Sequence, residues 1–314
     1  MSKNFLNVSG TETPVQLVYV CCSQHLNYLQ TLKASVLISR FVLKPLRITC
    51  LTDSVSYEKL TASLQGLFDS VICVATNHTD PLISSRYIKT SMRKHIKGDF
   101  LFLDVDAVAV RNDLARLVNC EHMGASPNID HCNIVPQFPY EVVPRFFKPM
   151  NWEYPISPYI NSGVLFCRDT AEVHEIFRKW HTCWLEQYTK LGIHNDQPAL
   201  NHILAQHPKL LTLLPIGFNS PVDVNSSFHK NAIVYHYYLS LADGKPCRTS
   251  VLGILSWHLE HKHPITHSLL TNLLNDDLPF VHDYFSLRKA ARSFQLRLTF
   301  QILQDRIVGK LSRK

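Results

Sequence analysis

Short, mostly apolar runs alternate with amphipathic stretches through the first third of the chain. The runs have the length and composition of buried strands and lie at residues 17–22, 46–51, 71–74 and 100–103. The stretches between them, at 28–40, at 57–64 and after Pro81, have apolar residues near helical spacing. This β-α-β-α-β-α-β order predicts a parallel, doubly wound sheet of the α/β class, with helices on both faces.

A long irregular segment, residues 128–158, separates these elements from the rest of the chain. It is rich in Pro and aromatic residues, and a loop of such length inside a compact domain is usually functional. We expect it to shape a binding pocket. The elements predicted beyond it are a strand, two helices and two short strands, at 160–167, 171–188, from Asn195 or Asp196 onward, 210–216 and 232–235.

The composition is that of an ordinary globular protein. Hydrophobic residues make up 46% and charged residues 18% of 314 positions, which suits one large or two smaller domains and argues against disorder. Neither a Gly-x-Gly-x-x-Gly fingerprint nor a Gly-x-x-x-x-Gly-Lys-Ser/Thr loop occurs. A dinucleotide-binding enzyme and a P-loop NTPase are therefore disfavoured, and any bound phosphates must be held by a metal and basic side chains.

Two further features favour a cytoplasmic protein. Residues 1–16 are polar, and no apolar run approaches the roughly 18 residues that a membrane span needs. The nine cysteines are scattered, with no Cys-x-x-Cys pair, which is typical of reduced thiols.

Much of the net charge of +7 comes from the C-terminal region. Residues 286–314 hold eight basic residues against the single acid Asp305, interleaved with apolar residues. This pattern predicts one or two basic amphipathic helices. Two interpretations stay open: peripheral contact with an anionic membrane at its cytoplasmic face, or a helix docked on the domain with its basic face in solvent. We expect no nucleic-acid partner.

Two carboxylates, Asp104 and Asp106, follow the strand predicted at 100–103. Ligands of open α/β sheets bind outside the carboxyl ends of the strands, which is where this pair leaves the core. Two such carboxylates repel each other unless a divalent cation neutralises them, and that cation usually keeps substrate phosphates among its ligands. The pattern therefore indicates a metal and phosphate site. A helix cap is the alternative, because Asn112 and Asp113 suggest a helix start nearby.

Further motifs follow in order along the chain. They are Asn161-Ser162-Gly163-Val164 at the start of a strand, Asp196-Gln197-Pro198-Ala199-Leu200-Asn201 at the start of a helix, and His236 after a late strand. Together with the acidic pair, this series resembles the GT-A glycosyltransferases, especially glycosyltransferase family 8, over roughly residues 15–260. The resemblance implies a GT-A fold. Combined with the polar N-terminus and the basic C-terminal pattern, it leads us to expect a flexible N-terminus at 1–15, a catalytic domain at 16–265 and a basic helical region at 266–314.

The resemblance also implies a metal cofactor, Mn²⁺ or in its place Mg²⁺, that bridges the diphosphate of a nucleotide sugar. Its ligands would be Asp104, Asp106 and His236. Independently of the resemblance, carboxylates plus one imidazole suit Mn²⁺ better than Zn²⁺ or Ca²⁺. For His236 alone, a satisfied interior histidine between Tyr235 and Tyr237 is the alternative interpretation.

In the resembled family, the counterparts of Asn161 and Asp196 bind the donor sugar, and those of Asp196 and Gln197 lie near the anomeric carbon. Arg86 and Lys89, three residues apart, share one helix face and would offset the charge of the donor. Gly163 would let the backbone approach the ligand closely. The residues expected to bind nucleotide and donor are Cys22, Ser23, Asp53, Arg86, Lys89, Asp104, Val105, Asp106, Asn161, Ser162, Gly163 and, as a shifted diphosphate-binding lysine, Lys245.

These features predict a metal-dependent glycosyltransferase that moves a hexose from a UDP-sugar to a hydroxyl of a glycan, glycolipid or protein acceptor, with retention of configuration. Two alternatives stay open. Asp104-Val105-Asp106-Ala107-Val108 fits the first motif of a haloacid-dehalogenase-type phosphohydrolase. A non-catalytic GT-A-like protein that binds a sugar or a partner is the other. A further histidine group is expected to lie on the surface: His258, His261, His263 and His267.

Overall fold

The computed structural model describes residues 15–23, 25–43, 46–64, 66–129, 143–153, 158–221, 231–237 and 250–275. Most of the irregular segment 128–158, Lys245 and the basic residues 286–314 lie outside this part of the chain, so the predictions made for them stay predictions. Within the described residues, no helix is long and apolar enough to cross a membrane.

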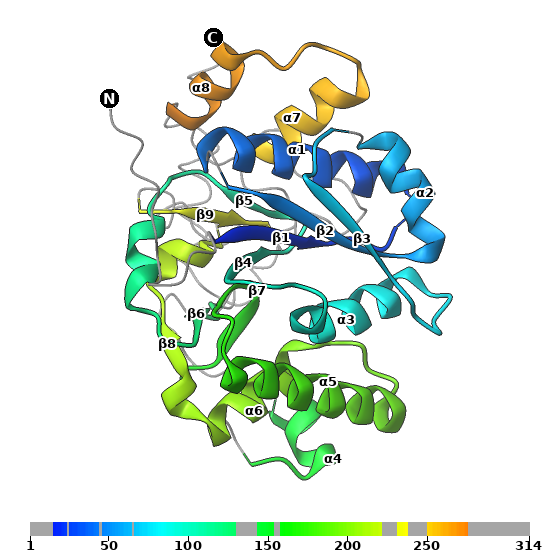
Figure 1. The fold of residues 1–314 in the computed structure, drawn as a ribbon, viewed down its shortest axis with the longest axis vertical. Coiled ribbons are helices and arrows are strands. Elements are labelled where there is room, and N and C mark those ends of the chain that lie inside the picture. The colour runs from blue at the N-terminus through cyan, green and yellow to red at the C-terminus, as the bar shows by residue number, and fades with distance from the viewer. Residues whose placement is uncertain are drawn as a thin grey trace, which may run out of the picture.

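A seven-stranded sheet in the order β3-β2-β1-β4-β7-β6-β8 forms the centre of the molecule (Figure 1). Its strands are β3 (Ser70–Val74), β2 (Ile48–Asp53), β1 (Gln16–Val20), β4 (Phe100–Leu103), β7 (Ile160–Cys167), β6 (Met123–Pro127) and β8 (Leu211–Leu213). The first four are parallel, β7 runs antiparallel to both β4 and β6, and β8 is parallel to β6. The predicted, mainly parallel α/β sheet is confirmed.

Helices cover both faces of this sheet (Figure 1). On one face lie α1 (Leu26–Val42), α2 (Ser54–Ser63), α7 (Val251–Glu260) and α8 (His267–Asn275). On the other lie α3 (Pro81–Ser91), α4 (Lys148–Met150), α5 (Ala171–Leu191) and α6 (Gln197–Gln206). The helices predicted within the described residues are thus present, with bounds that differ from the prediction by a few residues.

The side chains of each buried strand point alternately to the two faces of the sheet, and they divide the core into two layers. Leu17 and Tyr19 of β1 pack in the cluster that includes α1, whereas Val18 and Val20 pack in the cluster that includes α3 and α5. Successive side chains of a strand point to opposite faces, so a strand between two helical layers buries both faces and is apolar at most positions. This is why the buried strands were recognisable as continuous apolar runs.

A second, two-stranded sheet places the late histidine. β5 (Ala107–Ala109) and β9 (Val234–His236) are antiparallel, with Ala107 opposite His236. The hydroxyl of Ser35, in α1, donates to the carbonyl of Ala107 at 2.7 Å and ties β5 to the helical layer. Since β5 begins directly after Asp106, this pairing brings His236 next to the acidic motif. The sequence predicted a strand at 232–235 that ends before His236, whereas His236 is the last residue of β9.

Some predicted elements differ in the structure. The strand expected at 210–216 is shorter, because Pro215 cannot continue a ladder of hydrogen bonds, and residues Ile216–Asn219 form a 3-10 turn. The helix start suggested by Asn112 and Asp113 is a short 3-10 helix, Leu114–Asn119. β6, β5 and the antiparallel direction of β7 were not predicted.

A buried ion pair fixes the end of β7. Arg168 donates to the carboxylate of Asp99 at 2.8 Å and to the carbonyls of Cys120 at 2.7 Å and Val118 at 3.0 Å. Both charged side chains are less than one tenth exposed. The pair joins the residue before β4 to the segment that precedes β6.

We predict that Arg168→Met lowers the free energy of unfolding by about 3 to 5 kcal/mol, because it leaves the carboxylate of Asp99 buried without its cation. Chemical denaturation measures this. Arg178→Met is the matched control: Arg178 pairs with Glu175 at 2.6 Å, but its side chain is 66% exposed, and no measurable change is expected. Equal losses in the two variants would contradict this assignment.

Candidate functional site

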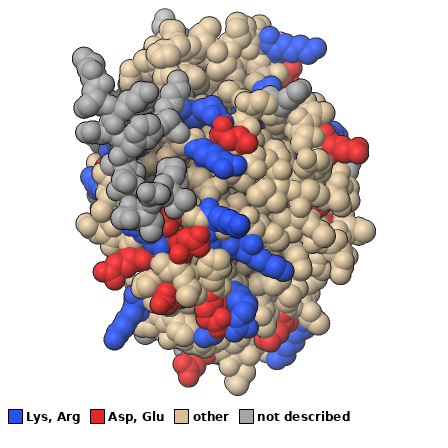
Figure 2. All heavy atoms as spheres, in the orientation of Figure 1, with Lys and Arg blue, Asp and Glu red and all other residues tan. Residues whose placement is uncertain are grey.

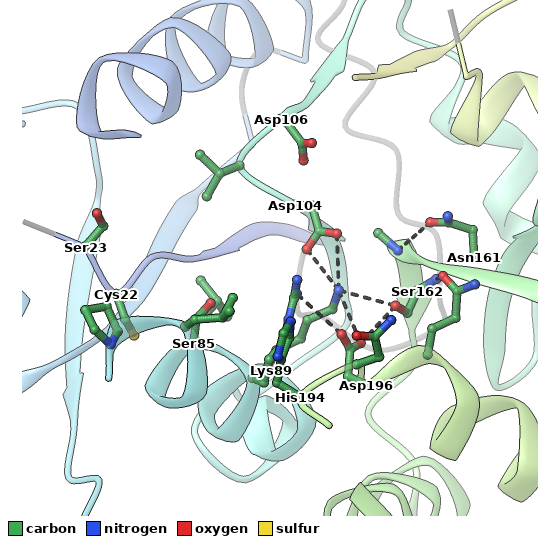
Figure 3. A pocket seen from close by; sticks show the side chains of 18 of the residues that line it. Cys22, Ser23, Ser85, Lys89, Asp104, Asp106, Asn161, Ser162, His194 and Asp196 are labelled. Atoms are coloured by element: carbon green, nitrogen blue, oxygen red, sulfur yellow. Dashed lines mark hydrogen bonds and ion pairs between the residues drawn. The ribbon is translucent and has the colours of Figure 1, made fainter. Parts of the chain in front are cut away.

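A cavity of about 650 Å³ opens at the carboxyl ends of β1 and β4, between the first turns of α1, α3 and α6 (Figure 3). This is the edge at which open α/β sheets bind ligands. Its lining residues are Val20, Cys22, Ser23, His25, Tyr28, Asp80, Pro81, Leu82, Ser85, Arg86, Lys89, Asp104, Val105, Asp106, Phe146, Tyr159, Asn161, Ser162, Gly163, His194, Asn195, Asp196, Gln197, Pro198 and His236.

Asp104, Asp106 and His236 converge at the centre of this cavity. Ligand atoms of the three residues lie within 4.8 Å of one another. The Nε2 atom of His236 is 3.4 Å from a carboxylate oxygen of Asp106 and 4.0 Å from one of Asp104. Burial alone would raise the pKa of Asp106, but the adjacent His236 lowers it below its ordinary value, so Asp106 stays ionised. Two carboxylate oxygens and one imidazole nitrogen form a donor set suited to a hard divalent cation.

Lys89 connects this group to Asp196. Its ammonium is 3.0 Å from a carboxylate oxygen of Asp104 and 3.4 Å from one of Asp196, and the side chain is 2% exposed. Figure 3 shows Lys89 between these two carboxylates and Ser162. Arg86, one turn earlier on α3, approaches the other carboxylate oxygen of Asp196 at 3.4 Å. The predicted shared face of Arg86 and Lys89 therefore points into the cavity.

Asp196 occupies the N-cap position of α6, yet within the described residues its carboxylate makes no capping hydrogen bond. It accepts instead from the hydroxyl of Ser162 at 2.9 Å. Burial would raise the pKa of Asp196, but Lys89 and Arg86 together lower it below its ordinary value. This carboxylate is therefore an anion at neutral pH, turned toward the cavity cations rather than toward the helix.

Gly163 is required by close packing against the acidic centre. A Cβ atom on Gly163 would collide with the ring of His236 and lie 2.8 Å from a carboxylate oxygen of Asp104. The backbone N–H of Asp104 donates to the carbonyl of Gly163 at 2.8 Å, which extends the pairing of β4 with β7 into the site. The absence of a side chain at 163 thus lets Asp104 and His236 approach each other.

The residues expected to hold the nucleotide base divide into two groups. Cys22 and Ser23 line the cavity, and in Figure 3 they lie at the end away from Asn161. Burial, with a contribution from Asp53, raises the pKa of the Cys22 thiol above its ordinary value, so this thiol is neutral. Asp53 is not among the lining residues. Its carboxylate accepts from the backbone N–H of Ser56 at 2.9 Å and caps α2.

The structure therefore brings every described residue of the predicted site into one cavity, apart from Asp53. Sequence reasoning missed Tyr28, Asn128 and Asn219. Tyr28 lines the cavity, and burial, with a contribution from Asp106, raises the pKa of its phenol, so the phenol stays protonated. Asn219 donates to Asn161 at 2.8 Å. Its sequence context, Gly-Phe-Asn-Ser-Pro, indicates only a turn.

The histidine group near the C-terminal end of the described chain is separate from this cavity. His261, His263 and His267 are exposed, as predicted, whereas His258 is half-buried. The rings of His261 and His263 lie 4.5 and 5.0 Å from that of Trp257. Figure 2 shows basic and acidic side chains intermingled on the face of the molecule seen in Figure 1.

No protein-family model and no curated protein sequence matches this chain. Solved structures do match. The apo structure of the bifunctional glycosyltransferase WbbM aligns with a TM-score of 0.53 at 15% identity, over 82% of this chain and 53% of that chain. At such identity the likeness establishes the fold, and this is the GT-A fold of glycosyltransferases.

Two other solved glycosyltransferases align over shorter parts of this chain. Mouse xyloside xylosyltransferase 1, in its apo form, aligns with a TM-score of 0.47 at 15% identity, over 72% of this chain and 98% of that chain. The galactosyltransferase LgtC, in complex with donor and acceptor sugar analogues, aligns with a TM-score of 0.48 at 17% identity, over 71% of this chain and 87% of that chain.

We predict that Asp196→Asn makes stability less dependent on pH. Because the pKa of Asp196 is lowered in the folded protein, its contribution is present above the unfolded pKa of about 3.9 and is lost as the pH falls through the folded value. Chemical denaturation should find the variant less stable at about pH 7, with the difference shrinking toward about pH 3.

Arg178 and Glu175 supply the control for this measurement. Glu175→Gln removes a carboxylate from an exposed pair and should leave stability nearly unchanged at both pH values. A difference between wild type and Asp196→Asn that stays constant down to about pH 3 would contradict the assignment of Asp196 as a buried, ionised partner of Lys89.

Proposed function

We propose that this chain is a glycosyltransferase that moves a hexose from a nucleotide diphosphate sugar, specifically a UDP-sugar, to a hydroxyl acceptor. The observation that carries the proposal is the convergence of Asp104, Asp106 and His236 within 4.8 Å, inside the cavity at the carboxyl edge of a GT-A fold. The resemblance of the four motifs to glycosyltransferase family 8 supports the same assignment.

The residues present fit a divalent cation. Among the described groups that meet in the cavity, the three carboxylates Asp104, Asp106 and Asp196 outnumber the two cations Lys89 and Arg86 that pair with them. A histidine must be neutral to bind a metal, and with His236 in that state the cluster keeps a negative charge beside an imidazole nitrogen, a combination that favours Mn²⁺ or Mg²⁺. Bound there, the metal would act as a Lewis acid on the departing diphosphate.

Lys89 and Arg86 would hold the donor phosphates next to this centre. Burial would lower the pKa of Arg86, but Asp196 and Asp104 raise it above its ordinary value, so the guanidinium is always charged. Both cations come from one face of α3 and are aimed into the cavity, where they can stabilise charge that develops on a leaving diphosphate. Lys245 remains a prediction for the same role.

Asp196 and Gln197 would lie at the anomeric carbon of the donor. The carboxylate of Asp196 is ionised and buried, so it can stabilise positive charge on the sugar but cannot act as an acid. The side chain of Gln197 accepts from the backbone N–H of Ser162 at 3.1 Å and is thereby fixed at the cavity wall. Retention of configuration, which the resemblance implies, is part of the proposal.

The acceptor would be a glycan, a glycolipid or a protein hydroxyl, and residues 128–158 are the segment proposed to shape its pocket.

Two alternative functions were left open by the sequence, a phosphohydrolase and a non-catalytic binding protein. The phosphohydrolase is not favoured, because the acidic motif follows the fourth strand of a GT-A fold. Release of UDP from donor sugars tests the non-catalytic alternative. A protein that binds UDP but releases none from any UDP-sugar would support that alternative.

We predict that UDP binds in a manganese-dependent manner and that the double variant Asp104→Asn/Asp106→Asn abolishes the manganese dependence. Calorimetric titration of UDP, with and without Mn²⁺, measures this. Neutral amides cannot replace two anionic ligands, so metal affinity should fall at least about tenfold. Asp113→Asn is the control, because Asp113 pairs with Arg116 through a 2.7 Å contact and does not line the cavity.

Absence of UDP binding under every condition would contradict the proposed donor. Equal manganese-dependent binding by wild type and the double variant would contradict the proposed metal site instead.

A further inference from the structure

A line of buried and half-buried amide side chains runs from His236 to Gln197. The Nδ1 atom of His236 is 2.7 Å from the amide oxygen of Asn219. The amide nitrogen of Asn219 donates to the oxygen of Asn161 at 2.8 Å. The nitrogen of Asn161 donates to Asn128 at 3.0 Å, and Asn128 also accepts from Gln197 at 3.3 Å. The two ends of this line are the proposed metal ligand and the proposed donor-sugar residue.

One backbone hydrogen bond fixes the direction of every bond between Asn161 and His236. The N–H of Gly163 donates to the amide oxygen of Asn161 at 2.8 Å, and a backbone N–H cannot accept. The atom of Asn161 on that side must therefore be its oxygen. Asn219, which faces the same oxygen, must present its NH₂ group there and its own oxygen to His236.

It follows that Nδ1 of His236 carries a proton. The oxygen of Asn219 can only accept, so Nδ1 has to donate. In the neutral ring the lone pair is then on Nε2, the nitrogen that faces Asp106 at 3.4 Å and Asp104 at 4.0 Å. An imidazole ligand needs this arrangement, with one nitrogen held by its N–H and the other presenting its lone pair to the cation.

Burial makes the direction of these bonds costly to reverse. Asn161 is 8%, Asn219 2% and His236 3% exposed. Turning the Asn219 amide would place oxygen against oxygen and nitrogen against a protonated Nδ1, and would break two hydrogen bonds between buried groups. Gly163 contributes twice, because its N–H sets the direction and its missing side chain leaves room for the ring.

We propose that Asn219 is a positioning residue for His236. Through Asn161 and the Gly163 N–H, it selects the ring tautomer whose Nε2 faces Asp104 and Asp106. This inference rests on the proposed function for the identity of the metal, but the tautomer itself is a property of the metal-free protein. Asn219 touches neither the metal nor the donor in this account, and its contacts are with His236 and Asn161.

The test compares wild type with Asn219→Leu, which removes both hydrogen bonds at similar side-chain volume. Nitrogen NMR of histidine-labelled, metal-free protein in alkaline buffer, where the ring is neutral, reports which ring nitrogen is protonated; a His236→Phe variant assigns the signal. Manganese affinity is measured from the paramagnetic resonance of free Mn²⁺. We expect protonated Nδ1 in wild type, its loss in Asn219→Leu, and about ten- to a hundredfold weaker Mn²⁺ binding.

Gln187→Leu is the matched control. Gln187 is a buried amide, 0% exposed, that donates to the carbonyls of Ile193 and Asn195 and makes no contact with His236. The Gln187→Leu variant should lose stability as Asn219→Leu does. It should nevertheless keep the wild-type tautomer of His236 and a manganese affinity within about twofold of wild type.

The outcomes separate this inference from the proposed function. Protonated Nε2 in wild type overturns the positioning role without any variant, even if Asn219→Leu fails to fold. Unchanged tautomer and Mn²⁺ affinity in a folded Asn219→Leu also overturn it and leave the proposed function intact. A wild type that binds no Mn²⁺ but shows protonated Nδ1, lost in Asn219→Leu, supports the positioning role and contradicts the metal centre.

Discussion

The buried ammonium of Lys89 is the interaction on which the site depends. It lies 3.0 Å from Asp104, at the end of β4, and 3.4 Å from Asp196, at the start of α6, and so holds two parts of the fold that would otherwise repel each other. Both carboxylates are turned into the same cavity, where water offers little screening. A cation from α3 therefore joins the proposed metal half of the site to the proposed sugar half.

The strand pairing and the packing around it place His236 in the site. The short β5–β9 pairing places His236 opposite Ala107, one residue after the acidic motif, although nearly 130 residues separate them in sequence. Gly163 leaves room for the ring, and Asn219 holds its Nδ1. The result is an anionic pocket with an oriented imidazole. A divalent cation, and then a diphosphate bound to that cation, would complete the site.

Sequence alone predicted the strands whose composition reflects burial. β1, β2 and β4 lie between two helical layers and are mainly apolar, although β1 begins with Gln16 and β2 contains Thr49, Thr52 and Asp53. β6 was missed since Met-Gly-Ala-Ser-Pro has little strand propensity and is a strand through its neighbours β7 and β8. The direction of β7 was missed because a buried apolar run is the same in either orientation. In the site, charged residues after strands were recognisable, whereas Asn219 gains its role from a contact that no local pattern encodes.

The central claim is that Asp104, Asp106 and His236 bind one divalent cation that receives a nucleotide diphosphate. Its most direct test is a crystal structure of the protein with MnCl₂ and UDP, recorded with anomalous scattering from manganese. We expect an anomalous peak in contact with both carboxylates and with Nε2 of His236, and the UDP diphosphate bound to the same ion. UDP seated in the cavity without manganese, or manganese bound elsewhere, would contradict the account.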